Sequence, residues 1–239
     1  MNSPLGGWGA LLILRRLREA AVFPPRFSYI CSETTLAAMA NALIDKKHYT
    51  VGEYFELEEY SETRHEFYHG ELFRMEGTTI RHNFIIDNVK DVVRAIFKPK
   101  GCIVVSEAIR LEALKNEYYP YPDILLSCHG FDRSAETMVR YPSLIVEVLS
   151  ESTAATDRGF KWHHYKNIPS LQHYLLVSQH ECLAELYSRT EKPEIWLYQS
   201  FENMAGTIDF RHLDFQLPLA KIYDGISFEP ETVGTSVES

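Results

Sequence analysis

Two apolar runs constrain the fold of this chain most, and each carries an acidic residue. Asp123 opens DILLSC, and Glu147 lies in SLIVEVL. A strand that is apolar throughout is covered on both faces, so an acid in it is paired, solvated at the sheet edge or bound to a cation. If the two strands pair, both carboxylates reach the same end of one sheet. Taken singly, either acid is equally well explained as a loop cap or as the partner of an arginine.

A lysine follows the second acid in the segment DRGFKWHHYK. Asp157, Lys161 and Tyr165 are spaced by four, which places all three on one face of a predicted helix over residues 157–167. From this face Lys161 could orient an attacking water or stabilise the charge of a pentacovalent phosphorus. The alternative is a solvated lysine paired with Asp157 on the same helix.

Two acids with a nearby lysine suit the hydrolysis of phosphodiester bonds. This reaction needs a nucleophilic water and a stabilised oxyanion, and one or two bound Mg²⁺ ions provide both. Magnesium is held by a few carboxylates with carbonyl oxygens and waters. We therefore expect Asp123 and Glu147 to bind Mg²⁺ or Mn²⁺.

The order of the remaining patterns indicates an α/β domain with a central mixed β-sheet flanked by helices. Thr50 and Glu53 form a capping box at the start of the first helix, and His69-Gly70 marks a hairpin turn. The expected helices span residues 51–60, 81–97 and 157–167, and the expected strands span residues 102–112, 123–128, 143–149, 170–178, 182–189 and 194–200.

Composition limits the other possibilities. The chain has 239 residues with 45% hydrophobic residues, which is enough for one core, and its net charge of −9 counts against tight non-specific binding of nucleic acid. The four cysteines form no CxxC pair, so neither a zinc ribbon nor a disulfide scaffold is indicated, and a reducing cytoplasm is expected. The apolar run within residues 9–23 is too short to span a membrane. GxSxG, P-loop, GxGxxG and HExxH motifs are absent from the sequence.

The domain is expected to span residues 39–228, with a disordered tail over 229–239. Residues 1–38 lack a sustained amphipathic period, and MANALIDKKHYT reads like a protein start, so Met39 is the predicted initiator. A genuine helix over residues 10–21 that packs on the domain is the alternative.

The ordered set of Asp123, Glu147 and Lys161 resembles the PD-(D/E)xK nuclease superfamily, and within it the Uma2 family of restriction endonucleases. The segment RHEFYHGELFRMEG, with Glu66 and Glu71, is similar to the N-terminal hairpin of that family. The resemblance covers residues 49–200. It implies a restriction-endonuclease-like core.

The resemblance also has consequences for individual residues. It implies that Glu66 or Glu71 supplies a third carboxylate, and that His82 matches a recurrent histidine, although a solvent-facing role for Glu71 and a structural role for His82 are open. In the superfamily a lysine usually lies two residues after the second acid, but this chain has Leu149 at that position. The resemblance implies that Lys161, on the following helix, has the role of that lysine. Ser150 to Thr153 also differ from the Ser-Pro-Ser-Thr of many members.

Together these patterns predict a metal-dependent endonuclease that acts on DNA as a homodimer. The second hypothesis is a catalytically inactive module of the same fold that binds nucleic acid or protein.

Overall fold

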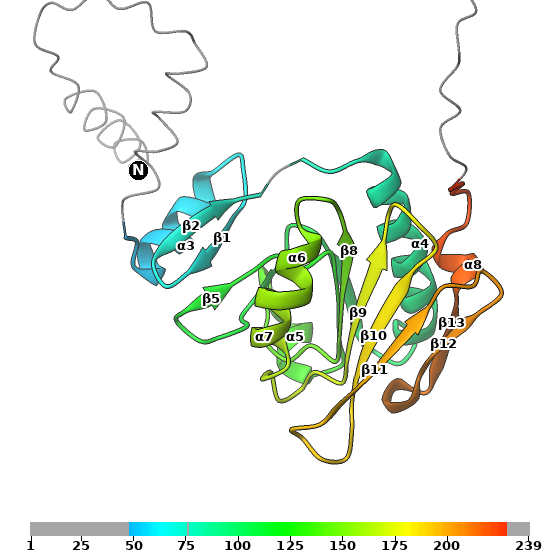
Figure 1. Cartoon of the computed structure of the whole chain (residues 1–239). Coiled ribbons are helices and arrows are strands. Elements are labelled where there is room, and N and C mark those ends of the chain that lie inside the picture. Colours follow the sequence, from blue (N-terminus) through cyan, green and yellow to red (C-terminus); the bar gives the residue numbers. More distant parts are fainter. Residues whose placement is uncertain (1–47, 76, 229–239) are drawn as a thin grey trace, which may run out of the picture. The chain divides into compact units, whose positions relative to one another are not determined.

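The computed structural model describes residues 48–75 and 77–228 (Figure 1). All of them belong to one structural unit. The predicted extension 1–38, the proposed initiator Met39 and the tail 229–239 lie outside the described residues. Within the described ranges, no helix combines the length and apolarity needed to cross a bilayer.

A six-stranded mixed sheet forms the centre of the unit, in the order β11-β10-β9-β8-β6-β3. Strands β8 and β9 are parallel, and the other neighbours are antiparallel. Both β8 and β9 are buried along their whole length, which is why their sequences are almost uniformly apolar. The strands are β3 (Ile103–Ser106), β6 (Ile124–Ser127), β8 (Leu144–Leu149), β9 (His173–Ser178), β10 (Ala184–Arg189) and β11 (Trp196–Phe201).

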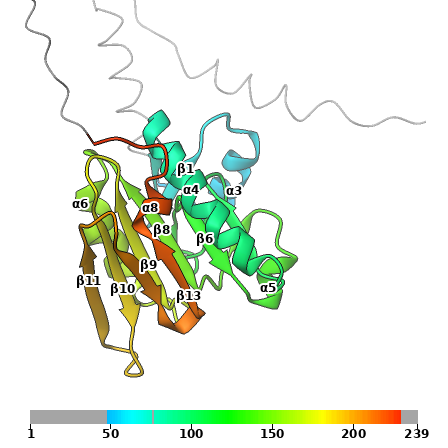
Figure 2. The same cartoon turned by 90° about the vertical axis from the view of Figure 1, so that its right-hand side faces the viewer.

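One face of the sheet packs against the long helix α4 (Ile80–Phe97), and Figure 2 is turned to face this side. Ile124, Val146 and Leu175 contribute to its apolar core. The predicted helix 81–97 is therefore confirmed, with Thr79 as its N-cap. The small antiparallel pair β12 (Thr207–Phe210) and β13 (Phe215–Pro218) and the short helix α8 (Leu219–Ile222) complete this layer.

The opposite face carries a helix in three parts: α6 (Ala154–Thr156), a π-helical turn over Asp157–Lys161 and α7 (Trp162–Tyr165). Tyr165 packs there with Leu125 and Ile145, which alternate along their strands with the residues of the first core. The helix thus starts earlier than the predicted residue 157. Its π turn was not expected, and such turns occur frequently at functional sites.

Helix α3 (Val51–Tyr60) is followed by the hairpin of β1 (His65–Tyr68) and β2 (Glu71–Arg74), and this hairpin belongs to a second, three-stranded sheet. The capping box and the hairpin are both confirmed. Gly70 has φ +89°, and an added Cβ would lie 2.7 Å from His48 Nδ1, so this turn requires glycine. Strand β5 (Tyr118–Tyr119) pairs with β1, and the buried rings of Tyr54, Phe67 and Tyr119 form a separate core.

The prediction of one strand over residues 102–112 was wrong. The chain leaves the central sheet after β3 because Glu107 adopts a left-handed conformation with φ 52°. It then forms β4 (Arg110–Leu111), which pairs with β7 (Met138–Val139) in a separate sheet. The short helices α5 (Gly130–Arg133) and η2 (Arg211–Leu213) were not predicted either.

A disulfide joins Cys102 and Cys128, a pairing that the spacing of the cysteines in the sequence did not indicate. Cys102 precedes β3 and Cys128 follows β6, and Ile103 pairs with Ser127 in the ladder between these strands. The two cysteines are therefore the next cross-strand neighbours, a relationship that 26 residues of separation conceal in the sequence. Cys182 is a free thiol.

Candidate active site

Strand pairing brings Asp123 and Glu147 to the same end of the sheet. Ile124 pairs with Val146, so each acid lies one residue beyond this pair. The Asp123 backbone N–H donates to Glu147 Oε2 at 3.4 Å, and the Val148 N–H donates to Asp123 Oδ2 at 2.6 Å. Asp123 lies two residues from Leu125, and Glu147 lies two residues from Ile145, so each acid points to the same face of the sheet as these core residues. This is the face covered by α6, the π-helical turn and α7.

Lys161 enters the same place from the π-helical turn. Its Nζ donates to Glu147 Oε1 at 3.0 Å and lies 3.1 Å from Asp157 Oδ1. A third carboxylate oxygen, Glu66 Oε1, lies 3.6 Å away. One buried ammonium group therefore contacts acids from a hairpin, a strand and its own helix.

Tyr165 and Asp157 support this arrangement from the helix. The Tyr165 hydroxyl donates to Glu147 Oε1 at 3.1 Å, so this oxygen accepts from both Tyr165 and Lys161. Asp157 is 1% exposed, and its backbone carbonyl accepts from the Tyr174 hydroxyl at 3.1 Å. The spacing by four thus places three functional side chains on one face, although part of the helix is a π turn.

The two hairpin glutamates have different environments. Glu66 contacts Lys161 and also accepts from the Tyr121 backbone N–H at 3.3 Å. Glu71 is exposed on β2 opposite Tyr68, and no contact within the described residues joins it to Lys161 or to the two sheet acids. Only the first of the two candidates reaches the cluster.

His82 approaches the site from the first turn of α4. Its Nε2 lies 3.1 Å from the Val148 carbonyl oxygen and 3.4 Å from Asp123 Oδ2. Burial lowers the pKa of His82, but the hydrogen bond and charge of Asp123 outweigh it, so the pKa is raised overall. His82 therefore holds Asp123 and the end of β8 together.

Charge is unbalanced in this cluster. Burial raises the pKa of Glu147 well above its usual value, and the neighbouring acids add to the shift while Lys161 opposes it. Burial likewise raises the pKa of Asp157. For Lys161, burial lowers the pKa, yet Glu147, Glu66 and Asp157 raise it well above the usual value, so the ammonium stays protonated. Acids outnumber bases here, which favours the binding of a cation.

The donor set fits Mg²⁺ or Mn²⁺ better than a softer metal. Its oxygen ligands would be the carboxylates of Asp123 and Glu147, completed by waters. Among the described residues, no group of three or more His, Cys, Asp or Glu side chains is placed to hold a metal ion, so the protein would contribute the two carboxylates alone. The Asp123 side chain is 17% exposed, which leaves a hydrated ion a route to it.

Tyr118 is a site residue that the sequence did not single out. It is 1% exposed, and its hydroxyl has no hydrogen-bond partner among the described residues. Burial and the charge of Glu66 raise its pKa, while Lys161 opposes them. A tyrosine in an apolar stretch such as YYPYP carries no signal that distinguishes a site residue from a core residue.

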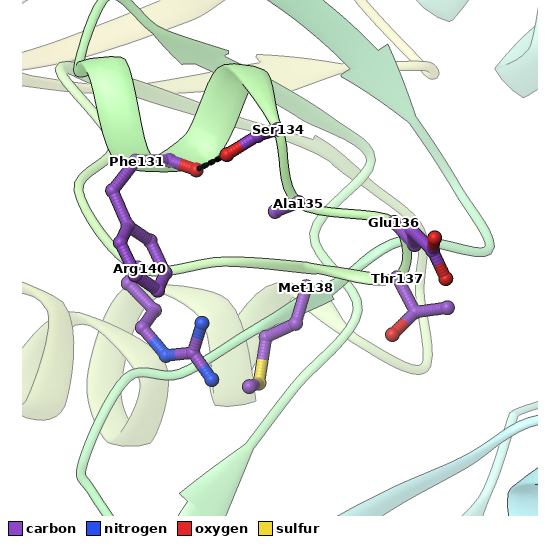
Figure 3. A pocket seen from close by; sticks show the side chains of 7 residues that line it. All are labelled: Phe131, Ser134, Ala135, Glu136, Thr137, Met138 and Arg140. Atoms are coloured by element: carbon purple, nitrogen blue, oxygen red, sulfur yellow. Dashed lines mark hydrogen bonds between the residues drawn. The ribbon is translucent and has the colours of Figure 1, made fainter.

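The acid cluster is distinct from two cavities in the described structure. One cavity has a volume of about 160 Å³, and Figure 3 shows the side chains that line it, among them Phe131, Met138 and Arg140. It lies beyond the C-terminal end of β6, whereas Asp123 precedes the N-terminal end of that strand. A second cavity of about 580 Å³ lies beside the last turns of α4, at Arg94 and Lys98. Neither cavity includes an acid of the cluster.

Comparisons with known proteins agree with this architecture. The family model Uma2, described as "Putative restriction endonuclease", matches residues 51–220. Two uncharacterized proteins of Synechocystis sp. are similar: one is 28% identical over 74% of this chain and 92% of its own length, and the other is 30% identical over 67% and 92%. A crystal structure from Anabaena variabilis, described as "a putative nuclease belonging to DUF820", matches with a TM-score of 0.59 and 16% identity over 73% of this chain and 97% of that chain.

The mixed sheet, with two acids on adjoining strands and a buried lysine above them, defines a protein with a restriction-endonuclease-like fold. Within that class, the chain belongs to the Uma2 family, because the match covers most of its length.

Proposed function

We propose that this chain is a metal-dependent endonuclease that hydrolyses phosphodiester bonds in DNA. The observation that carries the proposal is the contact between Lys161 and Glu147, 3.0 Å long, beside the backbone hydrogen bonds that join Asp123 to β8. A buried ammonium group and two carboxylates on adjoining strands meet the two needs of phosphodiester hydrolysis, which are an activated water and a stabilised oxyanion. The family description supports the same reaction class.

Asp123 and Glu147 would hold the Mg²⁺ or Mn²⁺ ion, which when bound would acidify a water and stabilise charge on the phosphoryl oxygens. Each acid is fixed before any ion arrives. The Val148 N–H holds one oxygen of Asp123, and Tyr165 and Lys161 hold one oxygen of Glu147. The other oxygen of Asp123, and Glu147 Oε2, which accepts a long hydrogen bond from the Asp123 N–H, would be available to bind the ion.

Lys161 would supply the fixed positive charge of the reaction. Its three acidic neighbours keep it protonated, and its position on the helix points Nζ at the ends of β6 and β8. A positioned cation stabilises the negative charge that develops on the phosphoryl group without having to reorganise. Asp157 and Glu66 would act as positioning residues for this ammonium.

A binding module of the same fold is the competing proposal. The net charge of −9 favours its protein-binding form, because an acidic protein gains little from contacts with phosphates. The two proposals differ in their need for a metal ion, since a binding module requires neither bound Mg²⁺ nor cleavage.

Isothermal titration calorimetry with Mg²⁺ and with Mn²⁺ separates the two proposals. We expect saturable binding to the wild-type protein and loss of that binding in Asp123→Ala. Glu191→Ala is the matched control, because Glu191 is an exposed acid after β10. Equal metal affinity in all three proteins, or no binding to the wild type, would reject the metal site and favour the binding module.

A further inference from the structure

An exposed aromatic ring lies directly beside Lys161 in the chain. Phe160 belongs to the same π-helical turn and is 38% exposed, although large apolar rings are usually buried. Its neighbour in the sequence, Lys161, contacts Glu147, which is one of the two acids that we propose bind the metal ion. The ring is therefore close to the position where a scissile phosphate would lie.

Phe160 is part of an ordered group of rings. Its ring centroid lies 4.8 Å from that of Tyr68 and 4.7 Å from that of His164, with edge-to-face geometry in both pairs. The buried ring of Tyr118 packs beneath, 5.4 Å from Phe160 and 5.1 Å from His164. The hairpin and the helix thus hold Phe160 in place from several sides. We call Tyr68, Phe160 and His164 the aromatic platform.

The face of the hairpin that carries Glu66 adds a further ring. Tyr68 lies two residues after Glu66 on β1, so both side chains point to the same face of the strand. Phe73 is the cross-strand partner of Glu66, which places it on that face as well, and it is 50% exposed. Exposed aromatic residues therefore lie on the hairpin and on the helix, next to the two side chains that contact each other, Glu66 and Lys161.

We propose that the aromatic platform stacks an unpaired nucleobase next to the scissile phosphate, so that the preferred substrate is DNA with a single-stranded stretch at the cleavage point. This inference rests on the proposed nuclease function for the position of the phosphate. The bases of an intact duplex are covered by their neighbours, so a ring beside the phosphate can stack only on a base that has left the helix.

The charge of the protein supports the same substrate. Tight binding to duplex DNA depends mainly on lysine and arginine contacts to phosphates, whereas this chain has a net charge of −9. Stacking of bases on aromatic rings adds affinity for single strands that does not itself depend on positive charge. Burial and the neighbouring His163 and His69 lower the pKa of His164, so its ring is neutral at pH 7 and stacks as an uncharged ring.

The test is fluorescence anisotropy with a labelled 12-nucleotide single strand and with a duplex of the same sequence, in EDTA so that no cleavage occurs. The variants are Phe160→Ala and Phe160→Tyr, which keeps a ring. Phe131→Ala is the matched control, because Phe131 is 52% exposed but follows the far end of β6. Thermal melting of each variant shows whether it is folded, and Phe73→Ala serves as a second variant on the hairpin.

We expect Phe160→Ala to weaken single-strand binding by about tenfold or more, the range for loss of one stacked base. Phe160→Tyr and Phe131→Ala should bind like the wild type, and the single strand should bind more tightly than the duplex. Equal binding of the single strand by wild type and Phe160→Ala, or tighter binding of the duplex, would overturn the inference. A separate assay of DNA cleavage with Mg²⁺ tests the nuclease proposal. Single-strand binding that depends on Phe160, without any metal-dependent cleavage, would reject the proposed nuclease function and support the proposed role of the aromatic platform.

Discussion

Lys161 Nζ and Glu147 Oε1 lie 3.0 Å apart, and both side chains are buried. The lysine is on the helix that covers the sheet, and the glutamate is on β8, one of the inner strands of the sheet. A buried charge is costly unless it is paired, so the carboxylate of Glu147 depends on Lys161, whereas Lys161 has Asp157 and Glu66 as further partners. This contact links the stability of the domain to the chemistry that we propose for it.

Removal of the lysine should therefore destabilise the protein strongly. Lys161→Met leaves Glu147 and Asp157 buried without their cation, and breaking a buried pair costs about 3–5 kcal/mol. The loss should be largest near pH 8 and smaller near pH 5, where the acids take up protons instead. Urea unfolding at the two pH values measures this difference.

The control for this experiment is Lys192→Met, which changes an exposed lysine. We expect it to unfold like the wild type at both pH values. If Lys161→Met were as stable as the control, the buried ion pair would not be a determinant of stability.

Glu147→Gln should make the protein less sensitive to pH. Burial raises the pKa of Glu147, so its folded pKa exceeds its unfolded pKa. Such a group contributes stability that is fully present below the unfolded pKa and is lost as the pH rises through the folded pKa. The variant lacks this loss, so it should be more stable than the wild type at neutral pH without metal. Thermal melting between pH 4 and pH 8 in EDTA measures the effect, and a wild-type pH profile in the variant would argue against it.

The sequence predicted much of the fold because most elements carry strong local signals. Helix α4 has a long apolar period, α3 has a capping box, and β8 is apolar throughout. The break after β3 was missed because it depends on one left-handed residue, Glu107, which no pattern marks. The disulfide was missed because it follows from the pairing of β3 with β6.

The sequence predicted those site residues whose positions follow from the regular spacing of side chains along a strand or a helix. Alternation along the strands and the spacing by four on the helix place Asp123, Glu147 and Lys161 together. The choice between Glu66 and Glu71 was not predictable, since both lie on one face of the hairpin and only the tertiary packing brings Glu66 to Lys161. Tyr118 was missed for the same reason.

His82 should give the wild-type protein extra stability at lower pH. Burial lowers its pKa, but Asp123 raises it further, so the folded pKa lies above the unfolded value. The contribution is fully present below the unfolded pKa and is lost as the pH rises through the folded pKa. The difference in unfolding free energy between wild type and His82→Gln should therefore be larger at pH 6 than at pH 9. His180→Gln, an exposed histidine, is the control and should show no such change.

The disulfide between Cys102 and Cys128 should stabilise the domain measurably. It closes a loop of 26 residues, for which the loss of unfolded-state entropy corresponds to roughly 3 kcal/mol. The double variant Cys102→Ser/Cys128→Ser should melt about 6–12 °C lower than the wild type. Cys182→Ser removes the free thiol and should melt like the wild type. Equal melting temperatures for all three proteins would show that this bond does not stabilise the fold.

The central claim is that the cluster at Asp123, Glu147 and Lys161 cleaves DNA with a divalent ion. The most direct measurement is a cleavage assay on supercoiled plasmid and on circular single-stranded DNA, with Mg²⁺, with Mn²⁺ and with EDTA. Wild type and the exposed-residue control Glu191→Gln should cleave with either ion and stop in EDTA, while Glu147→Gln, which retains the shape of the side chain but not its charge, should not cleave. Cleavage by Glu147→Gln at the wild-type rate, or the absence of any metal-dependent cleavage by the wild type, would contradict the claim.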